Sequence, residues 1–217
     1  MVSAGADVAD LLGARGRYAV GGGPLPPGRL LAIVVLGGAL YGLAMGSFAG
    51  ARGALYAALK VPLLVLGSAA LCLPNFYVVN AVLGLADDLR AAVRGIVSAQ
   101  ATFAVVLASL SPVTLFAYAS TDDYHAAKLL NGAMFALASL GAQHTLARHY
   151  RPLLARDARH RAALVVWPLL YLFVAAQLAY ALRPFVGNPR FPTELLRDDW
   201  LGNVYLDLYW SVRGLTG

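Results

Sequence analysis

Residues 30–49 read LLAIVVLGGALYGLAMGSFA and contain no charged side chain. The uncharged run between Arg29 and Arg52 holds 22 residues. About 20 apolar residues cross the hydrocarbon core of a bilayer as a helix, because a helix rises about 1.5 Å per residue. This stretch therefore predicts a transmembrane helix from about Leu30 to Ala49 and places the chain among membrane proteins.

Four further uncharged runs lie outward from this one. They hold 26, 27, 19 and 21 residues and are bounded by Lys60 and Asp87, Arg94 and Asp122, Lys128 and Arg148, and Arg161 and Arg183. Each is near or above the length that spans a bilayer. We expect spans over about Gly53–Leu73, Gly95–Tyr118, Ala126–Leu146 and Ala162–Leu182. Residues 74–91 begin with Pro74-Asn75 and are too interrupted for a span, which indicates an interfacial or re-entrant segment.

The composition agrees with a membrane protein and excludes other classes. Charged residues make up 13% of the 217 positions, against about 25% in soluble proteins. A single cysteine excludes an internal disulfide framework and a thiolate zinc site. The net charge of +6 would suit nucleic acid. The arginines flank membrane spans, however, so we predict a lipid bilayer as partner, no nucleic acid and no cofactor.

The expected fold is an all-α polytopic membrane bundle of about five transmembrane helices with a C-terminal interfacial amphipathic helix. Residues 1–29 are rich in Gly and Pro and predict a flexible cytoplasmic tail, residues 30–190 form the transmembrane domain, and residues 191–217 form the amphipathic segment. In that segment apolar side chains recur every four residues, at Leu196, Trp200, Val204 and Leu208. This helix is expected to lie on the membrane surface or to cap the end of the bundle.

The basic residues predict the orientation. The loop after the fourth expected span carries Arg148, Arg151, Arg156, Arg159 and Arg161. Arginine-rich loops stay on the cytoplasmic side of a membrane. We therefore expect the N-terminus inside, the C-terminus outside, and the acidic Asp122-Asp123 loop outside.

The glycines of the first expected span are regularly spaced. Gly38, Gly42, Gly46 and Gly50 follow one another at intervals of four residues. Glycines on one helix face let a second helix approach closely, which drives helix pairing in lipid. The pattern indicates helix packing within the chain or a homo-oligomer seam, and the sequence leaves both open.

Lys60 is the one cation placed well inside an expected span, two residues before Pro62. An intramembrane charge faces a cavity, finds a partner or snorkels to the surface. Lys60 is therefore a candidate for a pore lining or a ligand contact, with a structural role as the alternative. Uncharged polar residues are further pore or ligand candidates, with interhelical hydrogen bonding as the other interpretation: Asn75, Asn80, Asn131 and Gln177.

Catalytic patterns are weak. Asp122 and Asp123 with His125 form an incomplete set of metal ligands on an outer loop. No G-x-S-x-G, H-E-x-x-H or P-loop pattern occurs in the sequence. We predict that the protein is not an enzyme and has no metal site; a lipid-modifying enzyme is the weakest of three hypotheses.

Several short stretches resemble a known group. They are Lys60-Val61-Pro62, Leu71–Pro74, Tyr77–Gly84, Thr121–Asn131 and Leu182–Gly187. In these stretches the chain resembles uncharacterised bacterial multi-pass membrane proteins loosely related to the Yip membrane-trafficking superfamily. The resemblance implies a compact bundle of about five helices in the bacterial cytoplasmic (inner) membrane, and it implies no activity.

Two functions therefore lead. The glycine face, the Lys60-Pro62 break and the Pro74-Asn75 segment favour a homo-oligomeric channel or transport component. Small size and the lack of catalytic motifs suit a non-catalytic accessory or scaffold subunit of a larger membrane complex equally well.

Overall fold

The computed structural model describes residues 27–188, 194–196 and 202–206. In these residues every regular element is a helix, which confirms the all-α prediction. The elements in chain order are α2 (Pro27–Gly46), η1 (Ser47–Ala49), α3 (Ala51–Val82), η2 (Ala86–Asp88), α4 (Leu89–Ser120), α5 (Tyr124–Arg156) and α6 (His160–Leu182).

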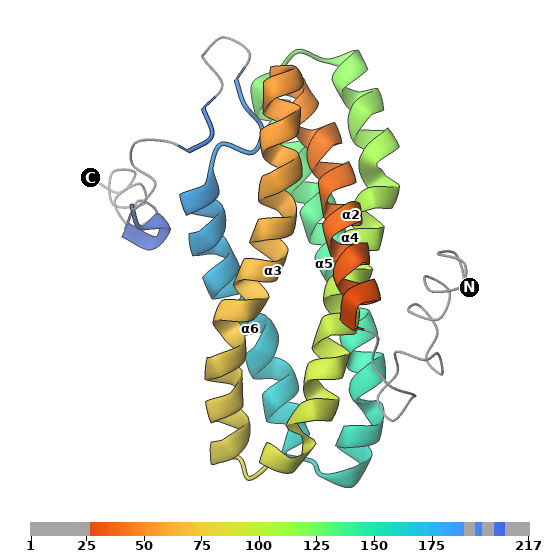
Figure 1. The fold of residues 1–217 in the computed structure, drawn as a ribbon, viewed down its shortest axis with the longest axis vertical. Helices are drawn as coiled ribbons and strands as arrows, with labels where there is room; N and C mark the ends of the chain where they lie inside the picture. The colour runs from red at the N-terminus through yellow and green to blue at the C-terminus, as the bar shows by residue number, and fades with distance from the viewer. Residues whose placement is uncertain (1–26, 189–193, 197–201, 207–217) are drawn as a thin grey trace.

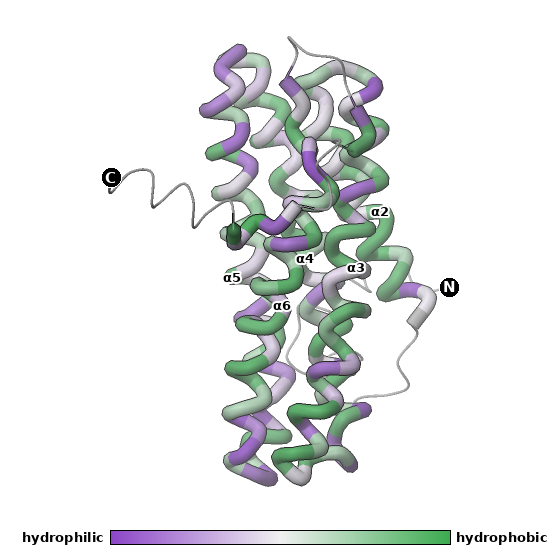
Figure 2. The backbone as a smooth tube through the Cα atoms, turned by 90° about the vertical axis from the view of Figure 1, so that its left-hand side faces the viewer, coloured by the Kyte–Doolittle hydropathy of each residue, from purple (hydrophilic) through white to green (hydrophobic). Residues whose placement is uncertain are grey.

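The helices form an elongated bundle (Figure 1). α3, α4 and α5 run along most of its length, whereas α2 packs on the upper parts of α3 and α4, and α6 packs on α3 from the lower end. We call the end with the α3–α4 and α5–α6 connections (residues 83–90 and 156–161) the basic end. The opposite end, with the α2–α3 and α4–α5 connections (residues 47–50 and 121–123), is the acidic end. Hydrophobic residues cover most of the helices between them, and hydrophilic residues recur at both ends (Figure 2).

Four segments of the described chain are long and apolar enough to cross a membrane: Gly28–Ala49, Ala51–Val82, Ala86–Ser120 and His160–Leu182. The expected span within α5 is not among them. Its sequence carries Asn131, Gln143 and His144, which lower the hydropathy of a helix that is otherwise long enough. By length and composition the chain is thus a multi-pass membrane protein with four candidate spans, where the sequence predicted five.

The prediction of an interfacial or re-entrant segment at residues 74–91 is wrong. α3 continues without a break through Pro74 to Val82 and is 32 residues long. A proline removes one backbone hydrogen bond, and the turns on either side keep the helix together. At about 1.5 Å per residue such a helix is roughly 48 Å long, so α3 extends beyond the hydrocarbon core.

Two expected regions fall largely outside the described residues. The tail at 1–29 is described only from Pro27, where α2 begins. The amphipathic segment at 191–217 is described only at 194–196 and 202–206, with one helical turn at Val204–Leu206. Leu196 and Val204 are described, whereas Trp200 and Leu208 lie outside.

The glycine face of α2 packs against α3 of the same chain. A Cβ atom on Gly42 or Gly46 would collide with the backbone carbonyls of Ala57 or Gly53. A Cβ on Gly38 would lie 3.2 Å from the Pro62 ring. Gly50 plays a different part, because its φ of +86° forms the turn into α3. Three of the four glycines thus let two helix backbones touch.

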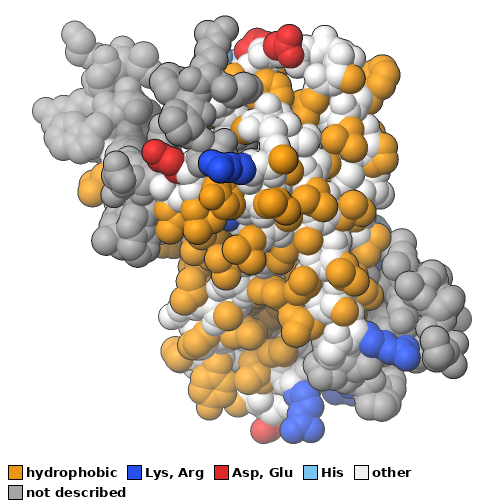
Figure 3. All heavy atoms as spheres, turned by 45° about the horizontal axis from the view of Figure 1, so that its top comes forward, with side chains coloured by type: hydrophobic (Ala, Val, Ile, Leu, Met, Phe, Trp, Pro, Cys, Tyr) orange, Lys and Arg blue, Asp and Glu red, His pale blue; other side chains and the backbone are white. Residues whose placement is uncertain are grey.

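The outer surface of the bundle is mostly apolar. The face in Figure 3 is covered by hydrophobic side chains, with few charged groups between the two ends. Large apolar side chains exposed on the helices include Leu36, Leu59, Phe116, Leu129 and Leu172. An apolar surface of this extent suits contact with lipid rather than with water.

Candidate functional site

A buried polar network joins three helices near the acidic end. Tyr41 of α2 donates from its hydroxyl to Oδ1 of Asn131 of α5, at 2.8 Å. Nδ2 of Asn131 donates to the Tyr118 hydroxyl of α4 and, at 2.7 Å, to the carbonyl of Ala127. Tyr118 in turn donates to the carbonyl of Met45 at 3.1 Å. The amide of Asn131 is thus satisfied by protein groups, which fixes the N-terminal half of α5 against α2 and α4.

A partly open pocket of about 780 Å³ lies beside this network. Its walls come from the N-terminal half of α5, from residues 179–188 and from Met45 and Leu64; we call it the α5–α6 pocket. Its lining residues are Met45, Leu64, Tyr124, Lys128, Asn131, Gly132, Phe135, Ala179, Arg183, Pro184, Phe185, Val186, Gly187, Asn188 and Glu194. The volume is typical of a small-molecule site.

Lys60 holds one wall of the pocket from behind. Its side chain is buried, with 2% exposed, and its Nζ donates to the carbonyl of Pro184 at 2.7 Å. The ammonium also lies 6.0 Å from the centre of the Phe185 ring. Pro184 and Phe185 line the pocket and Lys60 does not, so Lys60 anchors the segment after α6.

Gln177 anchors the C-terminal residues that the structure describes, as Lys60 anchors the segment after α6. Its Nε2 donates to the carbonyl of Gly202 at 2.8 Å, and its Oε1 accepts from the N–H of Val204 at 3.1 Å. The Tyr205 ring stacks on Phe173, with 4.5 Å between ring centroids. These contacts attach residues 202–206 to α6.

The acidic loop begins α5. Oδ1 of Asp123 accepts from the backbone N–H of His125 at 2.8 Å, which caps the helix. Asp122, Asp123 and His125 line a second pocket of about 670 Å³, together with Phe48 and Tyr118. Among the described residues no group of three or more His, Cys, Asp or Glu side chains is placed to hold a metal ion.

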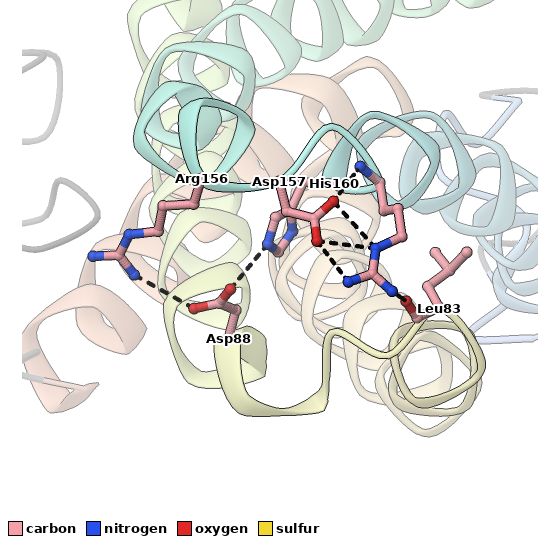
Figure 4. Close-up of polar contacts among 6 residues, drawn as sticks. Leu83, Asp88, Arg156, Asp157 and His160 are labelled. Carbon is pink, nitrogen blue, oxygen red and sulfur yellow. Dashed lines mark hydrogen bonds and ion pairs between the residues drawn. The ribbon is translucent and has the colours of Figure 1, made fainter.

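Ion pairs join the two connections at the basic end (Figure 4). One carboxylate oxygen of Asp88 lies 3.1 Å from Nε2 of His160, and the other lies 3.5 Å from Arg156. Because an ionised carboxylate only accepts hydrogen bonds, Nε2 of His160 carries the proton. Arg159 pairs with Asp157 and donates to the carbonyl of Leu83 at 2.7 Å, at the end of α3. These contacts join the start of α6 to the end of α3, at Leu83, and to the start of α4, at Asp88.

Asp157 has a shifted acidity. Hydrogen bonds from the Arg159 side chain, and then from its backbone N–H, lower the pKa of Asp157 from 3.8 to about 2. The pair is exposed, so this shift reflects good local geometry rather than burial. Asp157 therefore stays ionised in any ordinary buffer.

The other sequence candidates do not meet at one site. Asn75 is exposed on α3, and Asn80 is fully buried and donates to the carbonyl of Phe76 at 2.8 Å. Of these candidates, the structure brings only Asn131 into the lining of the α5–α6 pocket. Lys60 contacts the pocket wall from outside, through its hydrogen bond to Pro184. Sequence reasoning missed Tyr41, Tyr118 and Arg183. A tyrosine in the middle of an expected span is the sequence signal for Tyr41, whereas Lys128 and Arg183 mark only the limits of uncharged runs in the sequence.

By length and composition this is an all-helical multi-pass membrane protein, and the α5–α6 pocket lies beside its buried polar network. No family model, no curated protein and no solved structure matches the chain.

Proposed function

We propose that this protein is a transport component that binds a small apolar or amphiphilic ligand within a single chain. The observation that carries the proposal is the α5–α6 pocket of about 780 Å³. It lies in a bundle whose outer surface is apolar, so a ligand reaches it from the bilayer. A transport component of this kind would bind its ligand in this pocket, within a single chain.

The proposal includes five spans. α4 ends at the acidic end and α6 begins at the basic end, so α5 covers the same distance between them (Figure 1). If α4 and α6 cross a bilayer, α5 crosses it as well. Its deepest polar group, Asn131, is paired within the protein, which lowers the cost of its burial.

The charges of the two ends support the expected orientation. Residues 83–94 and 148–161 carry seven arginines against three aspartates, whereas the acidic end has Asp122 and Asp123 beside Arg52. By the positive-inside rule, the basic end faces the cytoplasm. The N-terminus would then lie inside and the residues after α6 outside, in a bacterial inner membrane if the resemblance to the Yip-related group holds.

Filling the pocket tests the function. Gly132 faces the pocket, and a Cβ atom there meets nothing within 4 Å, so Gly132→Trp adds bulk without forcing the backbone. Gly28 is equally open but lies at the start of α2, and Gly28→Trp is the matched control. Native mass spectrometry with oleate, oleyl alcohol and oleylamine should show one bound molecule of at least one compound. Gly132→Trp should remove that binding, and Gly28→Trp should keep it.

Transport itself has a separate readout. Reconstituted protein should speed the passage of the bound compound across vesicle membranes, and Gly132→Trp should abolish the acceleration. Equal binding and equal passage in Gly132→Trp and in the parent protein would refute the proposal.

The homo-oligomeric channel receives less support than it did from sequence. α3 of the same chain covers the glycine face, Lys60 bonds to Pro184, and Pro74-Asn75 lies inside a continuous helix. A ring of three or more identical chains in native mass spectrometry would favour the central pore again.

An accessory or scaffold subunit is the second candidate. α6 favours it, because only 11% of its apolar window is buried within the chain, against 39–44% for the other three candidate spans. Such a helix is covered by lipid or by another subunit. A different membrane protein that copurifies in mild detergent and is lost on Leu172→Asn, at an exposed position of α6, would support this reading.

A further inference from the structure

We infer that the ligand of the α5–α6 pocket is a single-chain amphiphile with an anionic head, carboxylate or phosphate, which Lys128 recognises. The inference rests on the proposed binding function and specifies its ligand class. It follows from the distribution of charge and apolar surface over the pocket walls.

Two cations and one carboxylate line the pocket: Lys128, Arg183 and Glu194. The ammonium of Lys128 lies 4.7 Å from the centre of the Tyr124 ring, and the guanidinium of Arg183 lies 3.4 Å from that of Tyr180. Aromatic faces hold cations in place without cancelling their charge. No described carboxylate forms an ion pair with Lys128. Lys128 is therefore a lining cation that is placed to pair with an anion.

Among the uncharged polar side chains of the pocket lining, Asn131 offers little to a ligand. Both functions of the Asn131 amide are engaged by Tyr41, Tyr118 and Ala127. The charged side chains of the lining offer the strongest contact to a head group, because a charge-assisted hydrogen bond is stronger than a neutral one.

The remaining walls suit a hydrocarbon chain. They are formed by Met45, Leu64, Phe135, Ala179, Phe185 and Val186. Along α5, Phe135 lies seven residues beyond Lys128, which is roughly 10 Å toward the middle of the bundle. A head group at Lys128 would thus place its tail along Phe135, in the apolar part of the membrane.

Charge substitutions at the pocket test the inference. Binding of oleate, oleoyl lysophosphatidate and oleyl alcohol is measured by native mass spectrometry of the full chain. The anions should bind at least roughly tenfold more tightly than the alcohol, because a hydrogen bond to a charged group has that effect. Lys128→Gln should remove most of this preference, Lys128→Arg should restore it, and oleyl alcohol should bind all three proteins alike.

Arg52→Gln is the control, because Arg52 lies at the same end and does not line the pocket. Its anion preference should equal that of the parent protein. Tighter binding of oleate or of the lysophosphatidate would identify carboxylate or phosphate as the head group.

The two proposals fail in different ways. If oleyl alcohol binds as tightly as the anions and Gly132→Trp blocks them all, the pocket function stands and the anionic ligand is refuted. If Lys128→Gln keeps the full anion preference, recognition by this cation is refuted. If no compound binds to the parent protein, both proposals fail.

Discussion

The two ends of the bundle are held together by different physical means. At the basic end, ion pairs that solvent reaches on at least one side join the helix connections, through Asp88 and Arg159, although the His160 partner of Asp88 is buried. At the acidic end, backbone-to-backbone packing of α2 on α3 and a network of uncharged polar groups do the same work, and a pocket remains beside them. Exposed ion pairs are weak and screened by salt, whereas close packing is short-ranged and intolerant of added volume. The comparison implies that the ends should respond to different perturbations.

The largest effect should come from the packed half. Gly42→Leu places side-chain atoms where the carbonyl of Ala57 lies, so the helices must separate. Overpacking typically costs 1–3 kcal/mol and sometimes more, and we expect about 3 kcal/mol or more here because backbone is the obstacle. Detergent-solubilised Gly42→Leu should lose its sharp gel-filtration peak and its cooperative thermal unfolding. Gly132→Leu is the control, and equal behaviour of both variants would contradict the packing.

A smaller, local effect is expected at Lys60. Lys60→Met removes the donor to the Pro184 carbonyl and should release the segment after α6. A hydrogen bond to a charged group contributes about 1.5–3 kcal/mol, so amide exchange at residues 185–188 should rise by roughly tenfold or more. Hydrogen–deuterium exchange read by mass spectrometry measures this. Lys128→Met should leave the exchange unchanged, and unaltered exchange in Lys60→Met would show that other contacts hold the segment.

Removal of the ion pairs at the basic end should lower the stability of the fold less than either of these changes. Asp88→Asn weakens the contacts with the buried His160 and with Arg156, and solvent reaches both Arg156 and the Asp88 carboxylate itself. Such pairs contribute about 1 kcal/mol or less, which for a chain of this size lowers the melting temperature by roughly 2–4 °C. Thermal unfolding at low and at high salt should converge for the parent and the variant. A loss of stability in Asp88→Asn as large as that in Gly42→Leu would contradict the proposed difference between the two ends.

The smallest expected effect on stability appears only at acidic pH. The pKa of Asp157 is lowered from 3.8 to about 2 in the folded protein, so its pairing stabilises the fold above pH 3.8. This contribution is lost as the pH falls from 3.8 through about 2, because the folded state must then take up the proton. In Arg159→Gln the melting temperature should fall less steeply over that window. Parallel pH curves for the two proteins would rule out a role for the pair in stability.

The sequence predicted the class, and it predicted both ends of α2 and α6 closely, because span length and charge gaps are direct consequences of the bilayer. α3 and α5 instead continue to Val82 and Arg156, well beyond the expected ends at Leu73 and Leu146. α4 and α6 begin or end within a few residues of the expected charged boundaries, although α4 starts earlier, at Leu89. The error at Pro74 has a physical cause. A proline and an asparagine are breaking signals in water, but tertiary packing carries a long helix across them, with Phe76 buried directly behind.

The pocket could not be predicted from the sequence. It depends on how far α6 diverges from α5 and on where residues 183–188 fold back, and neither follows from hydropathy. Lys60 shows the same limit: the pattern identified a costly charge, but its acceptor lies 124 residues away and is a backbone carbonyl, which has no sequence signature. The glycine spacing indicated a packing face, and only the structure shows α3 on it.

That separation of 124 residues also bears on how the protein is made. The ribosome delivers α3 to the membrane long before Pro184 exists, so a half-made chain holds Lys60 in the bilayer without its acceptor. An unpaired ammonium is costly in lipid, so we expect the nascent α3 to stay shallow or tilted until α6 has been inserted. The bond between Lys60 and Pro184 therefore forms only after α6 has been synthesised, and it distinguishes chains that contain α6 from shorter ones.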